Sequence, residues 1–364
     1  MRYRLDERSI AEPLAELERR RDLFANLPID PTHAEWLRRR AWVRTVHGTA
    51  RIEGNTASDI EVEALLEGEG TSKVSDREAR EIIGTRDALT LADELAASGT
   101  TPDEAVVREL NRRVLWNQSP LLTAGEYRRG ENRVQDAAGS AVFCTPPSGD
   151  VPDLMRQFGA WLTTSALQHP PPVAAALGHL EFVAIHPFND GNGRTARALV
   201  RLMLVQHGYA LDGLVSLDAQ LDLDRSAYFS AIREAIGRDY EPDYDATPFV
   251  RYLLGSITSA ADFVLARIRG LGELMIRVRR AIIDGSLPPG MIDGLAFAWV
   301  NRHIRAGDYI RLTGRARQSA TRDLAAAVAG GWLLATGEKR GRYYVLGPKL
   351  LETQAPGELT SPAR

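Results

Sequence analysis

Cysteine is almost absent from this chain of 364 residues, because Cys144 is the only one. A single thiol cannot form an internal disulfide, and it cannot build a metal site that needs several cysteine ligands. Proteins that fold without disulfides are typical of reducing compartments. We therefore expect an intracellular protein.

Long apolar runs are also missing at the start of the chain. Residues 1–6 read Met-Arg-Tyr-Arg-Leu-Asp, which does not resemble a secretory signal. No later stretch reads as both long enough and uncharged enough to cross a bilayer. We expect a cytoplasmic protein without a membrane partner.

The chain also lacks an excess of positive charge. The chain carries 45 Lys and Arg against 48 Asp and Glu, a net charge of -3 at pH 7. This balance argues against a protein whose whole surface is basic and binds nucleic acid, although it allows a local basic patch. With 44% hydrophobic and 26% charged residues, the chain has a globular composition, and its length predicts two or three domains.

What the sequence does contain is a stretch rich in functional groups, His186 to Arg197, which reads His-Pro-Phe-Asn-Asp-Gly-Asn-Gly-Arg-Thr-Ala-Arg. The run Gly191-Asn192-Gly193 predicts a tight turn, because glycine is unfavourable inside helices and readily takes positive φ. Apolar residues at helical spacing follow the turn. A helix beginning there presents unpaired N–H groups and the positive end of its dipole. We therefore predict a phosphate-binding site.

The charged residues of this stretch suit a nucleotide. Arg194 and Arg197 are three positions apart and share one helix face, so both guanidinium groups can reach a polyphosphate. Asp190 can hold a divalent cation, and His186 can accept a proton near neutral pH. Phe188 is expected to point inward. A solvated turn with a chance histidine is the alternative, and the coincidence of these groups disfavours it.

At every defined position this stretch resembles the motif of the Fic (filamentation induced by cAMP) family, His-x-Phe-x-Asp/Glu-Gly-Asn-Gly-Arg-x-x-Arg. The resemblance implies a protein adenylyltransferase that transfers AMP from ATP, with Mg²⁺, to a Ser, Thr or Tyr hydroxyl of a protein, the enzyme itself included. It also implies a mainly α fold, a helical core with a short β-hairpin flap. The implied roles are catalysis by His186, metal binding by Asp190, anchoring by Phe188, and ATP binding by Gly191, Asn192, Gly193, Arg194 and Arg197.

A second motif lies upstream, where Thr49 to Gly54 resembles the family's inhibitory motif Ser/Thr-x-x-x-Glu-Gly/Asn. Gly54 predicts a helix end, which places Glu53 at the negative end of the helix dipole, at a cost of up to about 1 kcal/mol unless a cation meets it. On local grounds Arg51 or solvent can satisfy Glu53. The resemblance instead directs Glu53 to Arg197, the expected γ-phosphate ligand. Glu53 would then either restrain AMP transfer or position a water for AMP removal.

Breaks in the pattern divide the chain into five parts. We expect a helical region with the inhibitory helix over 1–100, a catalytic core over 101–263, a connecting helix over 264–284, a winged helix-turn-helix domain over 285–348 and a tail over 349–364. A hairpin at about 125–147 resembles the family's flap, whose strand edge could pair with an extended target segment. A purely structural connection is the alternative there.

The C-terminal part resembles a winged helix-turn-helix domain because a helix, a turn, a helix and a basic-tipped hairpin follow one another. If it binds DNA, one set of residues would face the bases and another the phosphates. The first set is Gln318, Ser319, Thr321 and Arg322, and the second is Arg315, Arg317, Lys339, Arg340 and Arg342. Protein contacts or dimerisation, with solvated arginines, are the alternative. We also expect a homo-oligomer.

Two further functions stay open at this point. A sister group transfers phosphate instead of AMP, but its motif has a lysine where Gly191 stands. A DNA-binding regulator whose Fic domain senses a nucleotide or modifies its own chain is the alternative from another class. His179 could pair with His186 on a metal, but no further ligand lies at suitable spacing, so a packed or exposed histidine is expected. An aromatic at helical spacing, such as Tyr228, is expected in the core.

Overall fold

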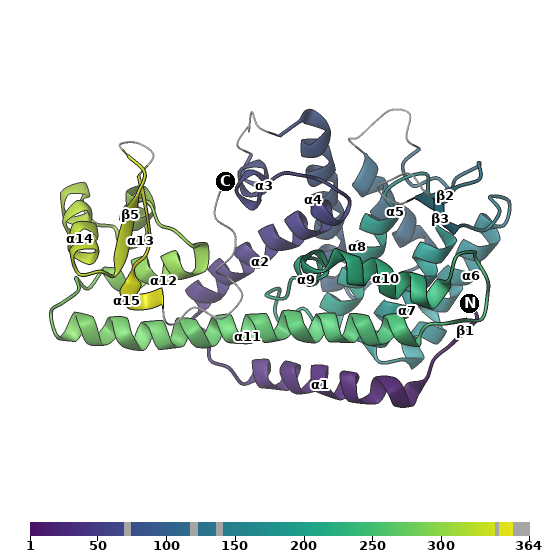
Figure 1. Ribbon diagram of the computed structural model, residues 1–364, viewed down its shortest axis with the longest axis horizontal. Coiled ribbons are helices and arrows are strands. Elements are labelled where there is room, and N and C mark those ends of the chain that lie inside the picture. Colours follow the sequence, from purple (N-terminus) through teal and green to yellow (C-terminus); the bar gives the residue numbers. More distant parts are fainter. Residues whose placement is uncertain (69–73, 117–122, 136–140, 339–341, 352–364) are drawn as a thin grey trace. The chain divides into compact units, whose positions relative to one another are not determined.

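The computed structural model describes residues 1–68, 74–116, 123–135, 141–338 and 342–351. Within these ranges the chain is mainly helical, with three two-stranded sheets (Figure 1), so the predicted mainly α fold is confirmed. The chain forms two compact units, one of residues 1–26 and 41–261 and the other of residues 27–40 and 262–364. Each unit is described by itself.

The first unit is built around helix α7 (Pro171–Ile185), which is buried on almost every residue. Its side chains are apolar except for His179 and Glu181, and a helix of that composition belongs in the interior. Helix α8 (Asn192–Gln206) follows in sequence and packs against both α7 and α4 (Asp76–Ala97). The junction between α7 and α8 therefore lies in the best-packed part of the unit.

Further elements surround this pair. The remaining helices of the unit are α1 (Glu7–Ala25), α3 (Asp59–Leu66), α5 (Glu104–Leu115), α6 (Val151–Thr163), η1 (Ser165–Gln168), α9 (Leu217–Leu223) and α10 (Arg225–Ile236). Helix α2 (Pro31–Ile52) begins in the second unit and ends in the first. Strand β1 (Tyr3–Arg4) pairs in parallel with β4 (Tyr244–Asp245).

The predicted hairpin is confirmed. Strand β2 (Arg133–Gln135) pairs antiparallel with β3 (Ala141–Cys144), and Val134 lies opposite Phe143. Residues 136–140, between the two strands, lie outside the described residues.

Helix α11 (Thr247–Ile283) is one continuous helix that runs through the position where the connecting helix over 264–284 was expected to begin. Among the described residues it is the one helix that is long and apolar enough to cross a bilayer by length and composition alone. The expectation that no stretch meets these criteria was therefore wrong. Of its most apolar window, 56% is buried inside the protein, so these side chains serve the core.

The second unit contains the three helices α12 (Met291–Asn301), α13 (Ala306–Thr313) and α14 (Arg317–Ala329), the hairpin of β5 (Leu333–Thr336) and β6 (Tyr343–Leu346), and α15 (Pro348–Leu351). Buried Tyr309 joins the three helices. Its ring lies against Gly294 of α12, where an added Cβ would come within 2.8 Å of it. Its hydroxyl donates to Asp323 of α14 at 2.8 Å.

Close contact between α4 and α5 depends on Gly84, where a Cβ would collide with the carbonyl oxygen of Val114. We expect Gly84→Ala to lower the free energy of unfolding by about 2 kcal/mol or more, because the two helices must separate. Gly255 is also inside a helix, but nothing lies within 4 Å of its Cβ position. Gly255→Ala should instead stabilise the protein by about 0.5 to 1 kcal/mol through helix propensity. Urea unfolding of both variants measures the contrast, and equal effects would contradict this packing.

Candidate functional site

His186 ends α7 in the left-handed conformation, with φ 50° and ψ 60°. Its Nδ1 lies 3.4 Å from the carbonyl oxygen of Val183. Because a carbonyl only accepts, Nδ1 carries the proton and Nε2 keeps its lone pair. Burial, and to a smaller extent the charge of Arg128, lowers the pKa of His186 to about 4. His186 is therefore a neutral base at physiological pH.

Arg128 connects the hairpin segment to the catalytic loop and was not among the predicted site residues. Its Nε donates to the carbonyl oxygen of His186 at 3.0 Å, and its Nη2 donates to that of Pro146 at 2.5 Å. Its main-chain N–H donates to Pro187 at 2.9 Å. The side chain is buried, so these bonds fix the position of His186 relative to the base of the hairpin.

The loop after His186 is braced from inside. Phe188 is 1% exposed and packs between the rings of Phe182 and Tyr127. The Asn192 amide donates to the carbonyl of Phe188 at 2.8 Å and accepts from its N–H at 3.0 Å. Because both ends of this amide serve the loop, only the main chain of Asn192 remains for the predicted ATP contact.

Asn111 of α5 supports the same loop from outside and was not predicted. Its Nδ2 donates to the carbonyl of Asp190 at 3.1 Å and to Thr195 at 3.2 Å, and its Oδ1 accepts from Gly125 at 3.0 Å. It is fully buried. Together with Asn192 it gives the loop a fixed shape before any ligand arrives.

The two glycines are required for different reasons. Gly191 has φ +77°, and its Cβ would lie 2.9 Å from Cγ1 of Val114. Gly193 lies in the first turn of α8, where a Cβ would overlap Oε1 of Glu53. No side chain caps this helix start. The first N–H groups of α8 are thus open to an anion, and the Glu53 carboxylate lies against Gly193 in this turn.

Arg194 is buried but incompletely paired. The residue is 6% exposed, and its Nη2 donates to Oδ1 of Asp190 at 3.2 Å. Its Nε and Nη1 are buried without a hydrogen-bond partner. Buried guanidinium donors without partners are costly, so an anionic ligand is needed to satisfy them.

Asp190 can contribute to a metal site without forming one alone. Its Oδ1 accepts from Gly191 at 2.6 Å and from Arg194, and the carboxylate is 46% exposed. In the described part of the chain no group of three or more His, Cys, Asp or Glu could hold a metal ion. One carboxylate combined with substrate phosphates is a usual ligand set for Mg²⁺, so the residues present fit that ion.

Arg197 is held by three residues, Thr49 and Glu53 at the end of α2 and Asp218 on α9. Its Nη2 donates to Oε1 of Glu53 at 2.7 Å and to the carbonyl of Thr49 at 3.2 Å, and its Nε donates to Oγ1 of Thr49. Asp218 of α9 lies 3.4 Å from its Nε. The side chain of Arg197 is 3% exposed, so this is a buried cation shared by two carboxylates.

Glu53 is the more accessible of these carboxylates. Its side chain is 34% exposed, whereas that of Asp218 is 6% exposed. Partial burial opposes ionisation of Glu53, but Arg197 and then Arg194 hold its pKa below the ordinary value. The local alternative, in which Arg51 satisfies Glu53, is wrong because Arg51 pairs with Asp222 at 3.2 Å.

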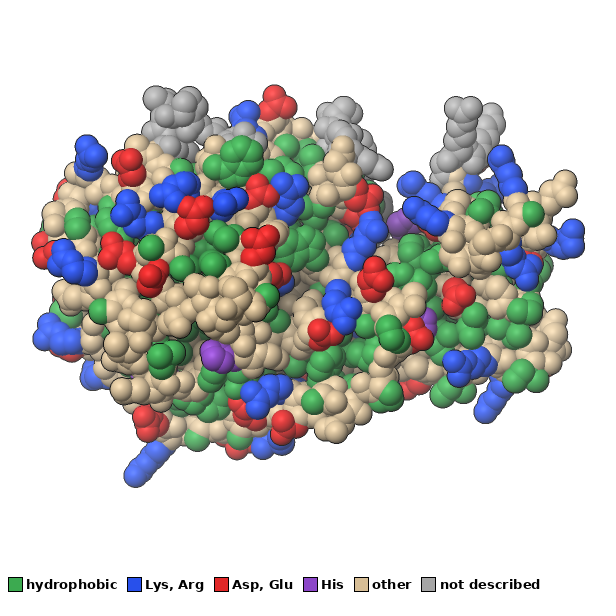
Figure 2. Space-filling model, turned by 180° about the vertical axis from the view of Figure 1, so that it is seen from behind, with side chains coloured by type: hydrophobic (Ala, Val, Ile, Leu, Met, Phe, Trp, Pro, Cys, Tyr) green, Lys and Arg blue, Asp and Glu red, His purple; other side chains and the backbone are tan. Residues whose placement is uncertain are grey.

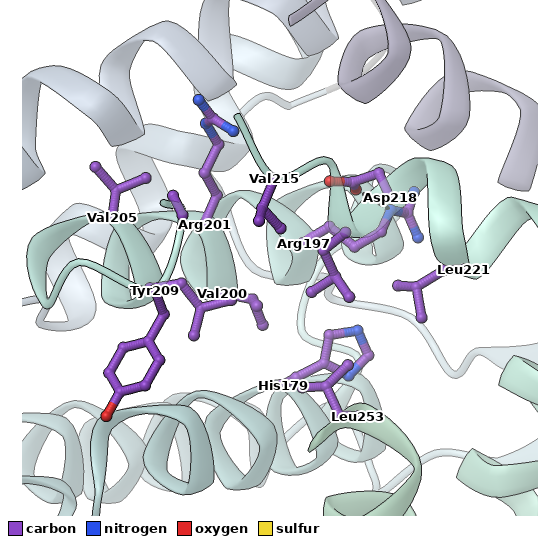
Figure 3. Close-up of a pocket in the computed structure, with 13 residues that line it drawn as sticks. His179, Arg197, Val200, Arg201, Val205, Tyr209, Val215, Asp218, Leu221 and Leu253 are labelled. Atoms are coloured by element: carbon purple, nitrogen blue, oxygen red, sulfur yellow. Dashed lines mark ion pairs between the residues drawn. The ribbon is translucent and has the colours of Figure 1, made fainter. Parts of the chain in front are cut away.

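Arg197 also lines a pocket, together with Asp218 and His179 (Figure 3). Arg197 and Asp218 lie beside each other at one end of it, and His179 projects from α7 below them. His179 is 1% exposed, and its Nε2 lies 2.8 Å from the hydroxyl of Tyr228. Burial lowers the pKa of His179 to about 3. The expectations of a packed histidine and a core tyrosine are confirmed.

Asp218 was missed because its partner lies far away in the sequence. The stretch Ser216-Leu217-Asp218-Ala219 places an acid on the first turn of a short helix, where dipole stabilisation alone accounts for it. Its one distinguishing signal is the position between Leu217 and Leu221, which both face the core.

The site presents a neutral histidine, an uncapped helix start and two buried arginines, a set of groups that suits a phosphate-bearing ligand. Residues 101–204 match the family model described as the Fic/DOC family. The chain therefore contains a Fic/DOC domain, which includes His186 through Arg197.

Curated relatives are similar over a longer part of the chain. The protein adenylyltransferase Fic of Drosophila ananassae is 31% identical over 264 residues, which cover 72% of this chain and 48% of that protein. The Drosophila melanogaster protein of the same name is 30% identical over 264 residues, 72% of this chain and 49% of that protein. The chain thus spans about half the length of the curated relatives that it matches.

Solved structures share the fold. Fic-1 of C. elegans is 28% identical with a TM-score of 0.60, over 71% of this chain and 72% of that chain. A Fic family protein from Desulfovibrio desulfuricans has a TM-score of 0.59 at 22% identity, over 95% of this chain and 98% of that chain. The latter likeness concerns the fold alone and extends over nearly the whole chain.

Asp218 and Asp222 lie one turn apart on α9 and offer a matched test of the ion pair between Asp218 and Arg197. We expect Asp218→Asn to lower the free energy of unfolding by about 2 to 4 kcal/mol, because it removes a buried partner of Arg197. Asp222→Asn should cost less than about 1 kcal/mol, because its partner Arg51 is 53% exposed. Urea denaturation compares the two variants. A larger loss in Asp222→Asn would contradict the assignment.

Proposed function

We propose that this chain is a protein adenylyltransferase that transfers AMP from ATP to a Ser, Thr or Tyr hydroxyl of a protein. One observation carries the proposal: buried Arg194, with two donor nitrogens unsatisfied, adjoins the uncapped start of α8 and the loop of neutral His186. A polyphosphate would satisfy the donors, and a hydroxyl would find its base. The names of the curated relatives support AMP as the transferred group.

In the proposed reaction the target hydroxyl gives its proton to Nε2 of His186. The hydroxyl oxygen forms a bond to the α-phosphorus of ATP, the bond from that phosphorus to the bridging oxygen breaks, and pyrophosphate leaves. Arg194 and the α8 N–H groups hold the phosphates in line, and Arg197 would reach the γ-phosphate. Positioning and charge neutralisation therefore supply most of the catalysis.

Asp190 would hold Mg²⁺ together with phosphate oxygens, since Oδ1 alone is engaged by the protein. The ion would neutralise charge on the departing pyrophosphate. The edges of the β2–β3 hairpin would receive the target segment by main-chain pairing, which would bring its hydroxyl toward His186.

Phosphate transfer is the less favoured reaction. Its sister group carries a lysine at the position of Gly191. Here that position has φ +77°, and Val114 and Asn111 leave no room for a Cβ. A lysine would therefore require a different loop.

Glu53 is proposed to restrain the enzyme. Its carboxylate lies against Gly193 and pairs with Arg197, so it occupies the place and the guanidinium that an anionic ligand needs. Because Asp218 also balances Arg197, Glu53 can withdraw without leaving that buried cation unpaired. AMP removal assisted by Glu53 is a second candidate, since a carboxylate beside the phosphate site could orient a water.

The second unit is proposed to form a winged helix-turn-helix arrangement. Helices α13 and α14 are joined by the three residues 314–316, and the β5–β6 hairpin follows. Ile304 adds a bridge to Tyr344 at the edge of this hairpin. These features support the expected order of elements.

Replacing Glu53 with glycine should raise transfer by about 10-fold or more, because the loss of a charged contact worth about 1.4 kcal/mol or more frees Arg197. The measurement is label incorporation from α-labelled ATP into the chain itself and into proteins of a cell extract. The γ-labelled nucleotide tests phosphate transfer in parallel.

The matched control is Glu67→Gly. Glu67 ends α3 as Glu53 ends α2, and a glycine follows each. It should leave transfer unchanged, and adding His186→Ala to Glu53→Gly should abolish transfer. Equal labelling by the Glu53→Gly and Glu67→Gly variants would refute the restraint, and labelling only from γ-labelled ATP would refute AMP transfer.

The lowered pKa of His186 predicts unusual acid tolerance. In the Glu53→Gly background, kcat/KM should stay nearly constant from about pH 7 to pH 5, because the base is protonated only as the pH falls toward about 4. A histidine with an ordinary pKa would lose about 25-fold over this interval. A pH profile measures the difference, and an acid limb centred near pH 6.5 would contradict the assigned environment.

A further inference from the structure

The Glu53 carboxylate needs a new partner when a ligand takes its place on Arg197. Asp218 keeps Arg197 balanced after Glu53 withdraws, but nothing in that exchange balances Glu53 itself. The withdrawn carboxylate then lies close to the phosphates that replaced it, and like charges at short range repel each other. A cation other than Arg197 is therefore needed beside the withdrawn carboxylate.

Helix α9 runs alongside the last turns of α2 in a fixed register. A Cβ on Gly48 would come within 2.7 Å of the main-chain carbon of Asp218, so the two helices touch there. One turn further along each helix, Arg51 pairs with Asp222 at 3.2 Å. The two contacts advance in the same direction along both helices. The chain that leaves α9 therefore begins α10 near the end of α2, where Glu53 lies.

Arg225 is the first residue of α10 and occupies this position. Tyr228 shares its helix face three residues later and lies 2.8 Å from His179, which Figure 3 shows next to Arg197. The face of α10 that carries Arg225 is therefore the face turned toward the Arg197 cluster. The electrostatics agree with this position, because burial opposes the ionisation of Glu53 while Arg197 and, further down the order of causes, Arg225 lower its pKa.

The charge of Arg225 is not committed elsewhere. Arg225 is exposed, and within the described ranges it makes no ion pair. Its guanidinium lies over the ring of Phe229, 5.5 Å from the centroid. By contrast, Arg51 is already engaged by Asp222. Over much of the face that Figure 2 shows, basic and acidic side chains lie close together, so exposure of an arginine alone assigns it no role. The place of Arg225 beside an exchangeable carboxylate does.

Helix stability does not explain Arg225. A positive charge on the first residue of a helix opposes the helix dipole, and no acid occupies the first turn of α10. The preceding Asp224 caps the helix by accepting from Ala227 at 2.9 Å. A helix selected only for stability would carry an acid where Arg225 stands. A carboxylate from another element explains the cation.

We propose that Arg225 receives the Glu53 carboxylate when the terminal phosphate of ATP displaces it from Arg197. Glu53 then pairs with buried Arg197 in the restrained state and with exposed Arg225 in the nucleotide-bound state. An exposed ion pair is weak, so Glu53 returns to Arg197 when the nucleotide leaves. This inference rests on the restraint proposed above and adds the second position of the carboxylate. Arg225 is a positioning residue, since it acts through Glu53.

The test is calorimetric titration of ATP and AMP into full-length His186→Ala protein, which binds without turnover, at an ionic strength of about 50 mM to limit screening. Adding Arg225→Gln should weaken ATP binding by about 3-fold, because the displaced carboxylate loses its partner. Binding of AMP should not change, since AMP lacks the phosphate that displaces Glu53. Arg225→Lys keeps the charge and should bind ATP nearly as the parent does.

The Glu53→Gln background isolates the exchange. There Arg225→Gln should leave ATP binding unchanged, because no carboxylate remains for Arg225 to receive. The matched control is Arg233→Gln, which removes the same charge from an exposed position two turns further along α10. It should leave the affinity for ATP unchanged in both backgrounds. Thermal unfolding verifies that all variants are folded.

Three results would overturn the exchange. Equal losses of ATP affinity on Arg225→Gln with and without Glu53 would make Arg225 a direct phosphate ligand. Equal ATP affinities of the Arg225→Gln and Arg233→Gln proteins in the presence of Glu53 would remove Arg225 from the site. An unchanged ATP affinity on Glu53→Gln alone would refute the restraint on which the exchange rests, and this result is distinct from the other two.

Discussion

The buried guanidinium of Arg197 is the constraint on which the arrangement of the site depends. A cation with a 3% exposed side chain must be balanced, and the chain supplies Asp218 from α9 and Glu53 from the end of α2. Asp218 is enclosed, whereas Glu53 is one-third exposed and rests on the glycine at the start of α8. Arg197 thus has one permanent and one exchangeable partner. This difference in burial gives a physical basis for a ligand to replace Glu53 without leaving an unpaired charge in the core.

The remainder of the site is arranged so that the anion position is fixed in advance. The side-chain amides of Asn192 and Asn111 form hydrogen bonds within the loop, and Arg128 fixes the main chain at His186. Arg194 keeps two donors unsatisfied. Such rigid donors need little reorganisation when a negatively charged ligand binds, and electrostatic catalysis requires this preorganisation. Gly191 and Gly193 are needed for this geometry. A side chain at Gly191 would collide with Val114, and one at Gly193 would collide with the Glu53 carboxylate.

Local sequence was sufficient for the mainly helical composition, the hairpin and the helix that follows Gly191, since these depend on neighbours within a few positions. It was insufficient where partners are distant. Glu53 and Arg197 are 144 positions apart, and local reasoning favoured Arg51 or solvent as the partner. Only the resemblance directed Glu53 to Arg197. Asn111 and Arg128 gave no periodic signal, and Asp218 gave only its position between two core-facing leucines, because each acts through tertiary contacts. Continuous helix α11 was also missed, since its charged second half concealed an apolar length sufficient for a bilayer.

The central claim is that Glu53 and the terminal phosphate of ATP compete for Arg197. Calorimetric titration of ATP and of AMP into His186→Ala and His186→Ala/Glu53→Gln proteins tests it without turnover. The account predicts that Glu53→Gln strengthens ATP binding by about 10-fold, a coupling of about 1.4 kcal/mol, and changes AMP binding little, because AMP lacks the phosphate that reaches Arg197. An equal gain for both nucleotides, or no gain for ATP, would contradict it.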